Sequence, residues 1–198
     1  TALLTGATGG IGVATAQLLA DRGVRLLLHC HRRTVEAERL RDTLVGGGHE
    51  VLRGDLADAE DCDAMVRTAI AGGGVDILIN NAGIFREHPP LETGAAAWRE
   101  YWDQTLAVNL LGPACLSHAL APHLGCDGRA GRIVNVSSRG AFRGEPTAPA
   151  YGASKAGLNA LGQSLAQALA PAGVSVFTVA PGFVATEMAA PVLDGPRG

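Results

Sequence analysis

The chain has 198 residues, a formal net charge of −3, 47% hydrophobic residues and only 18% charged residues. This length and composition suit one domain with a full core, and the mild acidity gives no reason to expect nucleic acid or an anionic membrane as a partner. No apolar run reaches the roughly 20 residues that cross a bilayer, and the N-terminus carries no secretory pattern. We therefore expect no membrane partner.

The cysteines and histidines predict neither a disulfide framework nor a metal site. Cys30, Cys62, Cys115 and Cys126 are spread along the chain without a C-x-x-C pair, which is typical of reduced thiols. None of the histidine pairs has the arrangement that metal ligands usually have. We expect a cytoplasmic protein without a bound metal.

Short apolar runs alternate along the chain with longer stretches of helical spacing. The runs are continuous, as in parallel strands covered on both faces. The predicted strands are Ala2–Leu4, Val24–Leu28, Glu50–Leu52, Asp76–Ile79, Arg132–Val136 and Val174–Val179. The predicted helices are Ile11–Asp21, Val35–Val45, Ala59–Ala71, Trp98–His123 and Tyr151–Ala170. Pro113 lies inside the fourth helix, where it either kinks the helix or divides it. This order predicts a doubly wound α/β sheet with helices on both faces, formed by a single domain over residues 1–198.

The first predicted strand runs into the glycine-rich segment Thr5-Gly6-Ala7-Thr8-Gly9-Gly10-Ile11-Gly12, and a helix follows. Glycines here allow a tight turn and a close approach of the backbone to a ligand, and the helix N-terminus offers free N–H groups to a phosphate. The alternative is a turn that serves only the fold. The position directly between a strand and a helix favours phosphate binding.

A second signal is Tyr151-Gly152-Ala153-Ser154-Lys155 at the start of a predicted helix. Residues four apart share a helix face, so Tyr151 and Lys155 point the same way. A neighbouring ammonium is expected to lower the pKa of a phenol, which then serves as general acid or general base. The pattern alone is weak, since a tyrosine near a helix start is usually a packing residue.

Taken together, T-G-x-x-x-G-x-G, N-N-A-G and Y-x-x-x-K resemble the short-chain dehydrogenase/reductase family, from Thr1 to about Met188. The resemblance implies a Rossmann-like fold and four catalytic residues. Ser138, rather than Ser137, has the family's spacing from the tyrosine and would hold the substrate oxygen. Asn109 would hold a water in a proton relay to the lysine. The implied catalytic residues are Asn109, Ser138, Tyr151 and Lys155.

The same resemblance places the cofactor contacts. Asp55 matches an acidic residue near the adenine, although a helix cap is an equal alternative for it. The expected cofactor-binding residues are Thr5, Gly6, Thr8, Gly9, Gly10, Ile11, Gly12, His31, Arg32, Arg33, Asp55, Leu56, Asn81, Ala82, Gly83, Tyr151, Lys155, Pro181, Gly182, Val184 and Thr186.

The end of the second predicted strand favours NADP(H) over NAD(H). Family members that prefer NAD carry an acidic residue where this chain has Cys30, and His31, Arg32 and Arg33 follow at once. A guanidinium suits a 2′-phosphate by charge and by paired hydrogen bonds. Either arginine could make the contact, or both merely solvate the start of a helix.

We therefore expect an NADP(H)-dependent enzyme that moves a hydride between nicotinamide and a carbonyl or secondary alcohol of a small molecule. A 3-oxoacyl-carrier-protein reductase is one substrate class, and the loop Ile84–Thr93 suggests a partly apolar wall for the substrate. The alternatives are a catalytically silent cofactor-binding or regulatory protein of the same fold, and a family member with lyase or epimerase chemistry.

The resemblance also implies a helix and a final strand after Gly182 that the sequence lacks. We expect a C-terminally incomplete chain, because Thr1 already lies in a strand and the start is clipped as well; the alternative is a truncated protein. The family further implies a homo-oligomer, a dimer or tetramer, through the helices around Asn109–His123 and Tyr151–Ala170.

Overall fold

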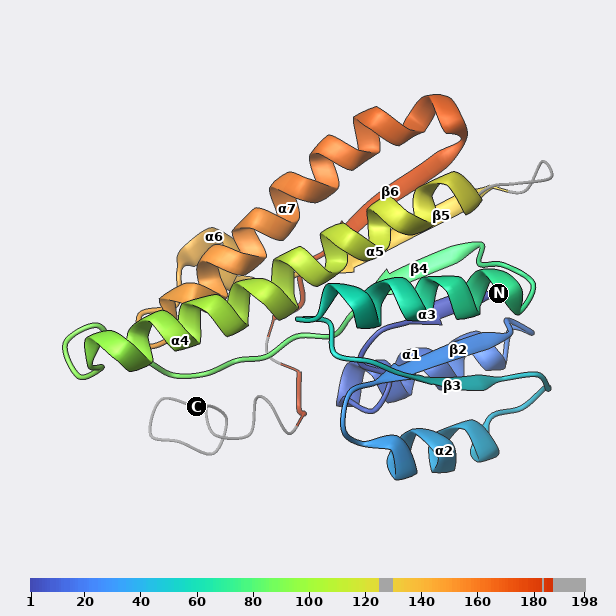
Figure 1. Ribbon diagram of the computed structural model, residues 1–198, viewed down its shortest axis with the longest axis horizontal. Helices are drawn as coiled ribbons and strands as arrows, with labels where there is room; N and C mark the ends of the chain where they lie inside the picture. Colours follow the sequence, from blue (N-terminus) through green and yellow to red (C-terminus); the bar gives the residue numbers. More distant parts are fainter. Residues whose placement is uncertain (125–129, 183, 187–198) are drawn as a thin grey trace.

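The computed structural model describes residues 1–124, 130–182 and 184–186, and they fold as an alternation of strands and helices (Figure 1). The strands are β1 (Ala2–Leu4), β2 (Leu26–Cys30), β3 (Glu50–Arg53), β4 (Ile77–Asn80), β5 (Gly131–Val136) and β6 (Val174–Val179). The helices are α1 (Gly10–Ala20), α2 (Thr34–Thr43), α3 (Ala59–Ala71), α4 (Ala95–Leu106), α5 (Gly112–Leu120), α6 (Gly140–Arg143) and α7 (Pro149–Leu169). Shorter helical turns are the π-helix η1 (Ala107–Leu111) and the 3-10 helices η2 (Ala121–His123) and η4 (Ala170–Ala172).

The strands form one parallel sheet in the order β3-β2-β1-β4-β5-β6. The chain builds outward from β1 to β3, then returns to the other side of β1 with β4. The carboxyl ends of β1 and β4 therefore flank the point where the strand order reverses. Ligands of open α/β sheets bind in the crevice at this switch point. The doubly wound α/β sheet predicted from the alternating pattern is thus confirmed, as is the Rossmann-like fold that the resemblance implies.

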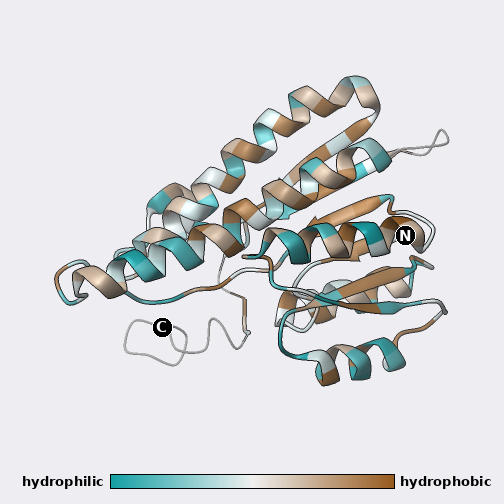
Figure 2. Cartoon of the chain, viewed as in Figure 1, coloured by the Kyte–Doolittle hydropathy of each residue, from teal (hydrophilic) through white to brown (hydrophobic). Residues whose placement is uncertain are grey.

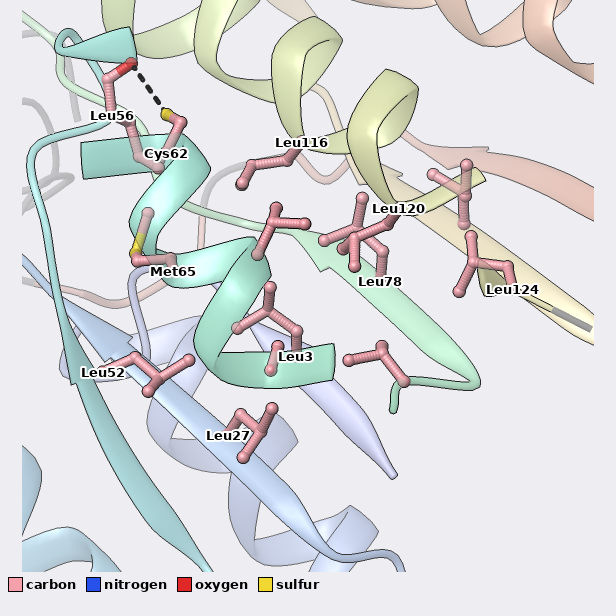
Figure 3. Packing of buried hydrophobic residues seen from close by; sticks show 14 of the residues in the cluster. Leu3, Leu27, Leu52, Leu56, Cys62, Met65, Leu78, Leu116, Leu120 and Leu124 are labelled. Carbon is pink, nitrogen blue, oxygen red and sulfur yellow. Dashed lines mark hydrogen bonds between the residues drawn. The ribbon is translucent and has the colours of Figure 1, made fainter. Parts of the chain in front are cut away.

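Each face of the sheet buries its own apolar cluster, because successive strand side chains point to opposite faces. Leu3 faces α3 and α5, whose residues Met65 and Leu116 belong to the same cluster (Figure 3). Leu4, next along the strand, joins the cluster under α1 and α2. Figure 2 accordingly shows the central strands predominantly brown, which marks apolar residues on both faces.

The fourth predicted helix is longer than expected and is interrupted. It begins at Ala95, and the π-helical segment η1 separates α4 from α5. Pro113 lies in the first turn of α5, where its missing N–H is tolerated. Figure 1 shows α4, η1 and α5 continuing as one long rod, so the proline divides the helix without ending it.

Other elements also differ from the sequence analysis. The short helix α6 was not predicted, β2 spans Leu26–Cys30 rather than Val24–Leu28, and α7 begins at Pro149, two residues before Tyr151. Proline at the first helical position has a suitable φ and leaves no N–H without a partner.

Strand β6 forms one edge of the sheet, and it is covered on one face only. Val174 is buried, whereas Phe177 and Val179 are 51% and 46% exposed. Within the described residues, no helix is long and apolar enough to cross a membrane.

Candidate functional site

A cavity of about 750 Å³ lies at the carboxyl ends of the central strands, at the switch point of the sheet. It extends from the glycine-rich segment to the start of α7. The sequence-predicted residues that line it are Gly6, Thr8, Gly9, Gly10, Ile11, Gly12, His31, Arg32, Arg33, Asp55, Leu56, Asn81, Ala82, Gly83, Tyr151, Lys155 and Thr186. The structure thus brings the glycine-rich segment and the Tyr151–Lys155 segment into one groove, which we call the switch-point groove.

The glycine-rich segment is shaped by the absence of side chains. Gly6 has a φ of +62°, and a Cβ on it would lie 2.7 Å from the Cα of Ala82. A Cβ on Gly12 would lie 2.3 Å from the carbonyl oxygen of Gly6. Helix α1 then begins without a side-chain cap, so its first N–H groups have no side-chain acceptor at the cap position. This arrangement leaves a backbone cradle and a helix dipole for a phosphate.

Thr5 lies beneath this cradle, in the sheet. Its side chain is 1% exposed and does not line the groove. The hydroxyl Oγ1 donates to the carbonyl of Ile79 and accepts from the backbone N–H groups of Asn81 and Ala82. The expectation that Thr5 contacts the cofactor is therefore replaced by a supporting role: it ties β1 to the N-N-A-G segment.

The far end of the groove carries the basic group after β2. Arg32 and Arg33 both line it, and Arg33 Nε lies 3.5 Å from the Glu36 carboxylate. His31 Nε2 lies 3.5 Å from Oδ2 of Asp55. These side chains are positioned where α2 and α3 begin, at the carboxyl ends of β2 and β3.

The structure decides between the two roles expected for Asp55, a cofactor contact and a helix cap. The residue that caps α3 is Asp58, whose carboxylate accepts from the N–H groups of Glu60 and Asp61. Asp55 accepts from the N–H of Ala57 and lines the groove. The helix-cap alternative for Asp55 is therefore wrong, and its carboxylate belongs to the groove.

Tyr151 points toward the end of β5. Ser138 Oγ accepts from the N–H of Gly140. Burial raises the pKa of the Tyr151 phenol, the Ser138 side chain opposes this, and Glu145 adds to the rise. We expected Lys155 to lower this pKa, but Lys155 does not contribute to the shift and burial is its largest cause, so the phenol keeps its proton at neutral pH.

Lys155 is one helical turn further along α7 and is 3% exposed. Its Nζ donates to the carbonyl oxygen of Val136 at 2.8 Å and lies 5.8 Å from the centre of the Tyr151 ring. Burial lowers the pKa of Lys155 from 10.5 to about 8. Lys155 therefore remains a cation beside the phenol at neutral pH, but it holds its proton less firmly than a lysine in water does.

Asn109 lies in the π-helical segment η1, and its side chain is fully buried. Its Oδ1 accepts from the N–H of Ile84, and its Nδ2 donates to the Ile84 carbonyl and to Oγ of Ser154. A Cβ on Gly83 would lie 3.4 Å from both Asn109 Oδ1 and Lys155 Nζ. Because residue 83 has no side chain, the space between the Asn109 amide and the Lys155 ammonium stays open.

Among the described residues after β6, Thr186 lines the groove. A Cβ on Gly10 would lie 2.6 Å from Cγ2 of Thr186, so this threonine lies directly over the cradle. Pro181, Gly182 and Val184 do not line the groove, nor do Asn109 and Ser138. Pro181 instead accepts a hydrogen bond from the N–H of Arg139 through its carbonyl.

Several residues of the groove were not predicted as site residues. His29 bridges two loops: its Nδ1 accepts from the N–H of Gly6, and its Nε2 lies 3.0 Å from the carbonyl of Gly54. No motif marks His29 as a site residue, and only its place before Cys30 could have indicated it. The unpredicted lining residues are His29, Cys30, Ala57, Ile84, Arg86, Gln104, Val108, Val136 and Ser137.

The family model for short chain dehydrogenases matches residues 1–196. The chain belongs to the short-chain dehydrogenase family. It is 33% identical over 190 residues to a 3-oxoacyl-[acyl-carrier-protein] reductase of Synechocystis, covering 94% of this chain and 75% of that one. It is 39% identical over 196 residues to a cis-4-hydroxycyclohexanecarboxylate dehydrogenase of Sinomonas cyclohexanicum, covering 96% and 75%.

A solved dehydrogenase/reductase of Sinorhizobium meliloti 1021 superposes on this short-chain dehydrogenase with a TM-score of 0.85 and 37% identity, covering 94% of this chain and 73% of that one. The chain is thus an oxidoreductase that acts on CH–OH or C=O groups. Members of this family use a nicotinamide dinucleotide, and the phosphate cradle shaped by Gly6 and Gly12 fits such a group.

Proposed function

We propose that this short-chain dehydrogenase is an NADP(H)-dependent enzyme that interconverts a carbonyl compound and its secondary alcohol. The observation that carries the proposal is the continuity of the switch-point groove. One cavity holds a phosphate cradle and two arginines at one end, and Tyr151 with Lys155 at the other. A dinucleotide lying along it would bring its nicotinamide toward the phenol.

The acid–base chemistry rests with Tyr151 and Ser138. A bound nicotinamide dinucleotide would supply the hydride in reduction and accept it in oxidation. The substrate oxygen would lie between the two hydroxyl groups, which are close enough for Ser138 to influence the pKa of the phenol. Because burial raises the pKa of Tyr151, the phenol is protonated at neutral pH and suits proton donation to a carbonyl oxygen.

Lys155 and Asn109 support this proton transfer. The Lys155 ammonium lowers the cost of a phenolate by its positive charge, in a site where water screens little. The open space beside Gly83 joins Lys155 to the Asn109 amide, where a water could pass the proton onward. Asn109 is held there by the Ile84 backbone, so its orientation does not depend on a ligand.

The preference for NADP(H) is supported by charge at the far end of the groove. Cys30 cannot accept the ribose hydrogen bonds that an acidic residue would, and Arg32 and Arg33 line the groove beside it. Arg33 is engaged with Glu36, whereas no salt bridge involving Arg32 occurs within the described part of the chain. Arg32 is therefore our candidate for the main contact with a 2′-phosphate.

The substrate class is supported by likeness alone. The relative from Synechocystis is named a 3-oxoacyl-[acyl-carrier-protein] reductase, and a β-oxo thioester is one substrate to test first. Phe85 packs its ring edge-on against Tyr151, with centroids 5.1 Å apart. An apolar wall beside the acid fits a substrate with an alkyl chain next to its carbonyl.

The test is cofactor titration by fluorescence, with NADPH against NADH, followed by turnover of a ketone and β-oxo thioester panel. We expect tighter binding of NADPH and turnover that Tyr151→Phe abolishes while NADPH binding remains. Cofactor binding without turnover of any substrate would support a catalytically silent binding protein instead. If the protein bound neither NADPH nor NADH, the proposal that it is an enzyme would be contradicted.

We also propose that the protein is a homodimer or homotetramer through the long rod of α4, η1 and α5. Leu111 in η1 is 57% exposed, which places an apolar side chain on this surface. Light scattering after size exclusion, with Leu111→Glu as the variant, tests this. A wild-type monomer would contradict it.

A further inference from the structure

The loop between β4 and α4 contains a histidine, His88, that the chemistry above does not use. Its side chain is 1% exposed, although the loop itself lies at the surface. The ring packs against two aromatic residues of α4, with centroid distances of 5.4 Å to Trp98 and 5.6 Å to Tyr101. A buried imidazole in such a place needs hydrogen-bond partners for both nitrogens.

Both nitrogens of His88 have partners, and the partners fix the tautomer. Nδ1 lies 2.8 Å from the carbonyl oxygen of Arg86, which can only accept. Nε2 lies 3.2 Å from the backbone nitrogen of Ala150, which can only donate. The ring is therefore the neutral imidazole with its proton on Nδ1 and a lone pair on Nε2.

The Ala150 N–H is the one that α7 cannot satisfy by itself. The cap residue Ala148 has no side-chain oxygen, and Pro149 has no N–H. The next two N–H groups, of Tyr151 and Gly152, reach the Ala148 carbonyl. His88 thus caps α7 from 62 positions away, directly before the tyrosine.

The loop is tied to the same segment by three more contacts. The His88 N–H donates to the Thr147 carbonyl at 2.6 Å. The Thr147 hydroxyl donates to Glu87 at 2.9 Å. Phe85 lies edge-on against the Tyr151 ring. One loop therefore touches both the backbone that precedes the tyrosine and the ring of the tyrosine.

We propose that His88 is a positioning residue for Tyr151: as a neutral hydrogen-bond acceptor it caps α7 and locks the Ile84–Thr93 loop, so that phenol and apolar wall keep one geometry. The inference rests on the proposed role of Tyr151 in proton transfer. His88 does not touch the cofactor cradle. Its loss should therefore affect the chemical step far more than cofactor binding.

The central experiment compares two variants of His88. His88→Phe keeps an aromatic ring against Trp98 and Tyr101 but leaves the Ala150 N–H without an acceptor. His88→Gln places an oxygen the same number of bonds from Cβ as Nε2 and can accept that N–H. We expect His88→Phe to lower kcat by about 10-fold to 100-fold, because misplacing a reacting group by about 1 Å costs this much. NADPH affinity should change less than about 2-fold, and Gln should restore much of kcat.

Arg25→Ala serves as the control for general destabilisation. Arg25 donates to the carbonyls of Gly48 and Gly72 at the amino end of the sheet, away from the groove. At temperatures that leave all variants folded, this control should keep the wild-type kcat. Equal losses of kcat in His88→Phe and His88→Gln, in proportion to their losses in Tm, would overturn the positioning role.

A second readout does not require turnover. The chain has two tyrosines, so the ultraviolet titration of a protein minus that of its Tyr151→Phe form isolates Tyr151. If the loop loosens in His88→Phe, water reaches the phenol and its midpoint moves to lower pH; Arg25→Ala should leave it in place. An unchanged midpoint in His88→Phe overturns the inference. Full activity of Tyr151→Phe would instead overturn the proposed function.

Discussion

The ammonium nitrogen of Lys155 lies 5.8 Å from the centroid of the Tyr151 ring, one turn along the same helix. The two groups are pushed in opposite directions by the same cause. Burial raises the pKa of the phenol and lowers the pKa of the lysine to about 8. The two pKa values, 10.0 and 10.5 in water, therefore move apart, so that the phenol holds its proton more strongly and the lysine holds its proton less strongly than in water.

The buried lysine should make stability depend on pH. A lysine whose folded-state pKa is lowered binds its proton more weakly in the folded state than in the unfolded state. The free energy of unfolding is lowered by the full amount below pH 8, and this loss is relieved as the pH rises from about 8 toward 10.5. We expect the stability of wild type relative to Lys155→Met to increase over this window, by of order 3 kcal/mol.

Denaturant unfolding of both proteins at pH 7 and pH 10 measures this difference. The direct check is nuclear magnetic resonance of the lysine side chain, since Lys155 is the single lysine of the sequence. Its signal should titrate near pH 8. A midpoint near 10.5 together with a pH-independent stability difference would contradict the expected penalty.

Tyr151→Phe should remove proton transfer and leave cofactor binding intact. The aromatic ring and its edge contact with Phe85 remain, while the phenol hydroxyl beside Ser138 is lost. A positioned acid or base contributes about 10²-fold to 10⁴-fold to a rate, so kcat should fall by that factor. In wild type, oxidation of the alcohol should become faster as pH rises, because the phenol must lose its proton and burial raises its pKa.

Steady-state kinetics in both directions across pH 6 to 10 tests this, with Tyr101→Phe as the matched control. Tyr101 contacts the Arg86 guanidinium and does not line the groove. If oxidation proved fastest at low pH, another residue would have to be the base.

Arg32→Ala should weaken NADPH binding more than Arg33→Ala does. Arg32 lines the groove and makes no salt bridge with the described residues, whereas Arg33 is engaged with Glu36. A charge-assisted hydrogen bond contributes about 1.5–3 kcal/mol, which is about 10-fold to 100-fold in Kd. NADH affinity should hardly change in either variant. Fluorescence titrations with both cofactors decide this, and equal losses for NADH and NADPH would rule out a 2′-phosphate contact.

The sequence predicted those features that depend on residues close together in the chain. Continuous apolar runs such as Leu26–Leu28 occur because parallel strands are buried on both sides, and all six predicted strands are present, although β2 ends at Cys30 and not at Leu28. The glycines at 6 and 12 are required by close backbone contacts within one loop. The contact between Tyr151 and Lys155 follows from helical spacing alone.

The remaining features depend on residues far apart in the chain, so no local pattern could predict them. His88 caps a helix 62 positions later, and the π-helical turn at Asn109 is fixed by the Ile84 backbone. The rise in the pKa of Tyr151 follows from burial that only the folded chain creates. Thr5 matched the motif correctly, yet its hydroxyl faces the sheet because Asn81 and Ala82 need an acceptor there.

Gly12→Ala tests whether the cradle is limited by space. A Cβ at this position would lie 2.3 Å from the Gly6 carbonyl oxygen and 2.9 Å from the Ala7 backbone, and neither backbone atom can move without reshaping the loop. We expect a lower Tm and a loss of NADPH affinity of at least about 10-fold, because overpacking costs about 1–3 kcal/mol. Gly47→Ala is the matched control, since nothing lies within 4 Å of its Cβ position. Should Gly12→Ala bind NADPH as wild type does, the cradle around Gly6 would have to be wider than the contacts at Gly12 allow, and the phosphate would have to bind elsewhere in the groove.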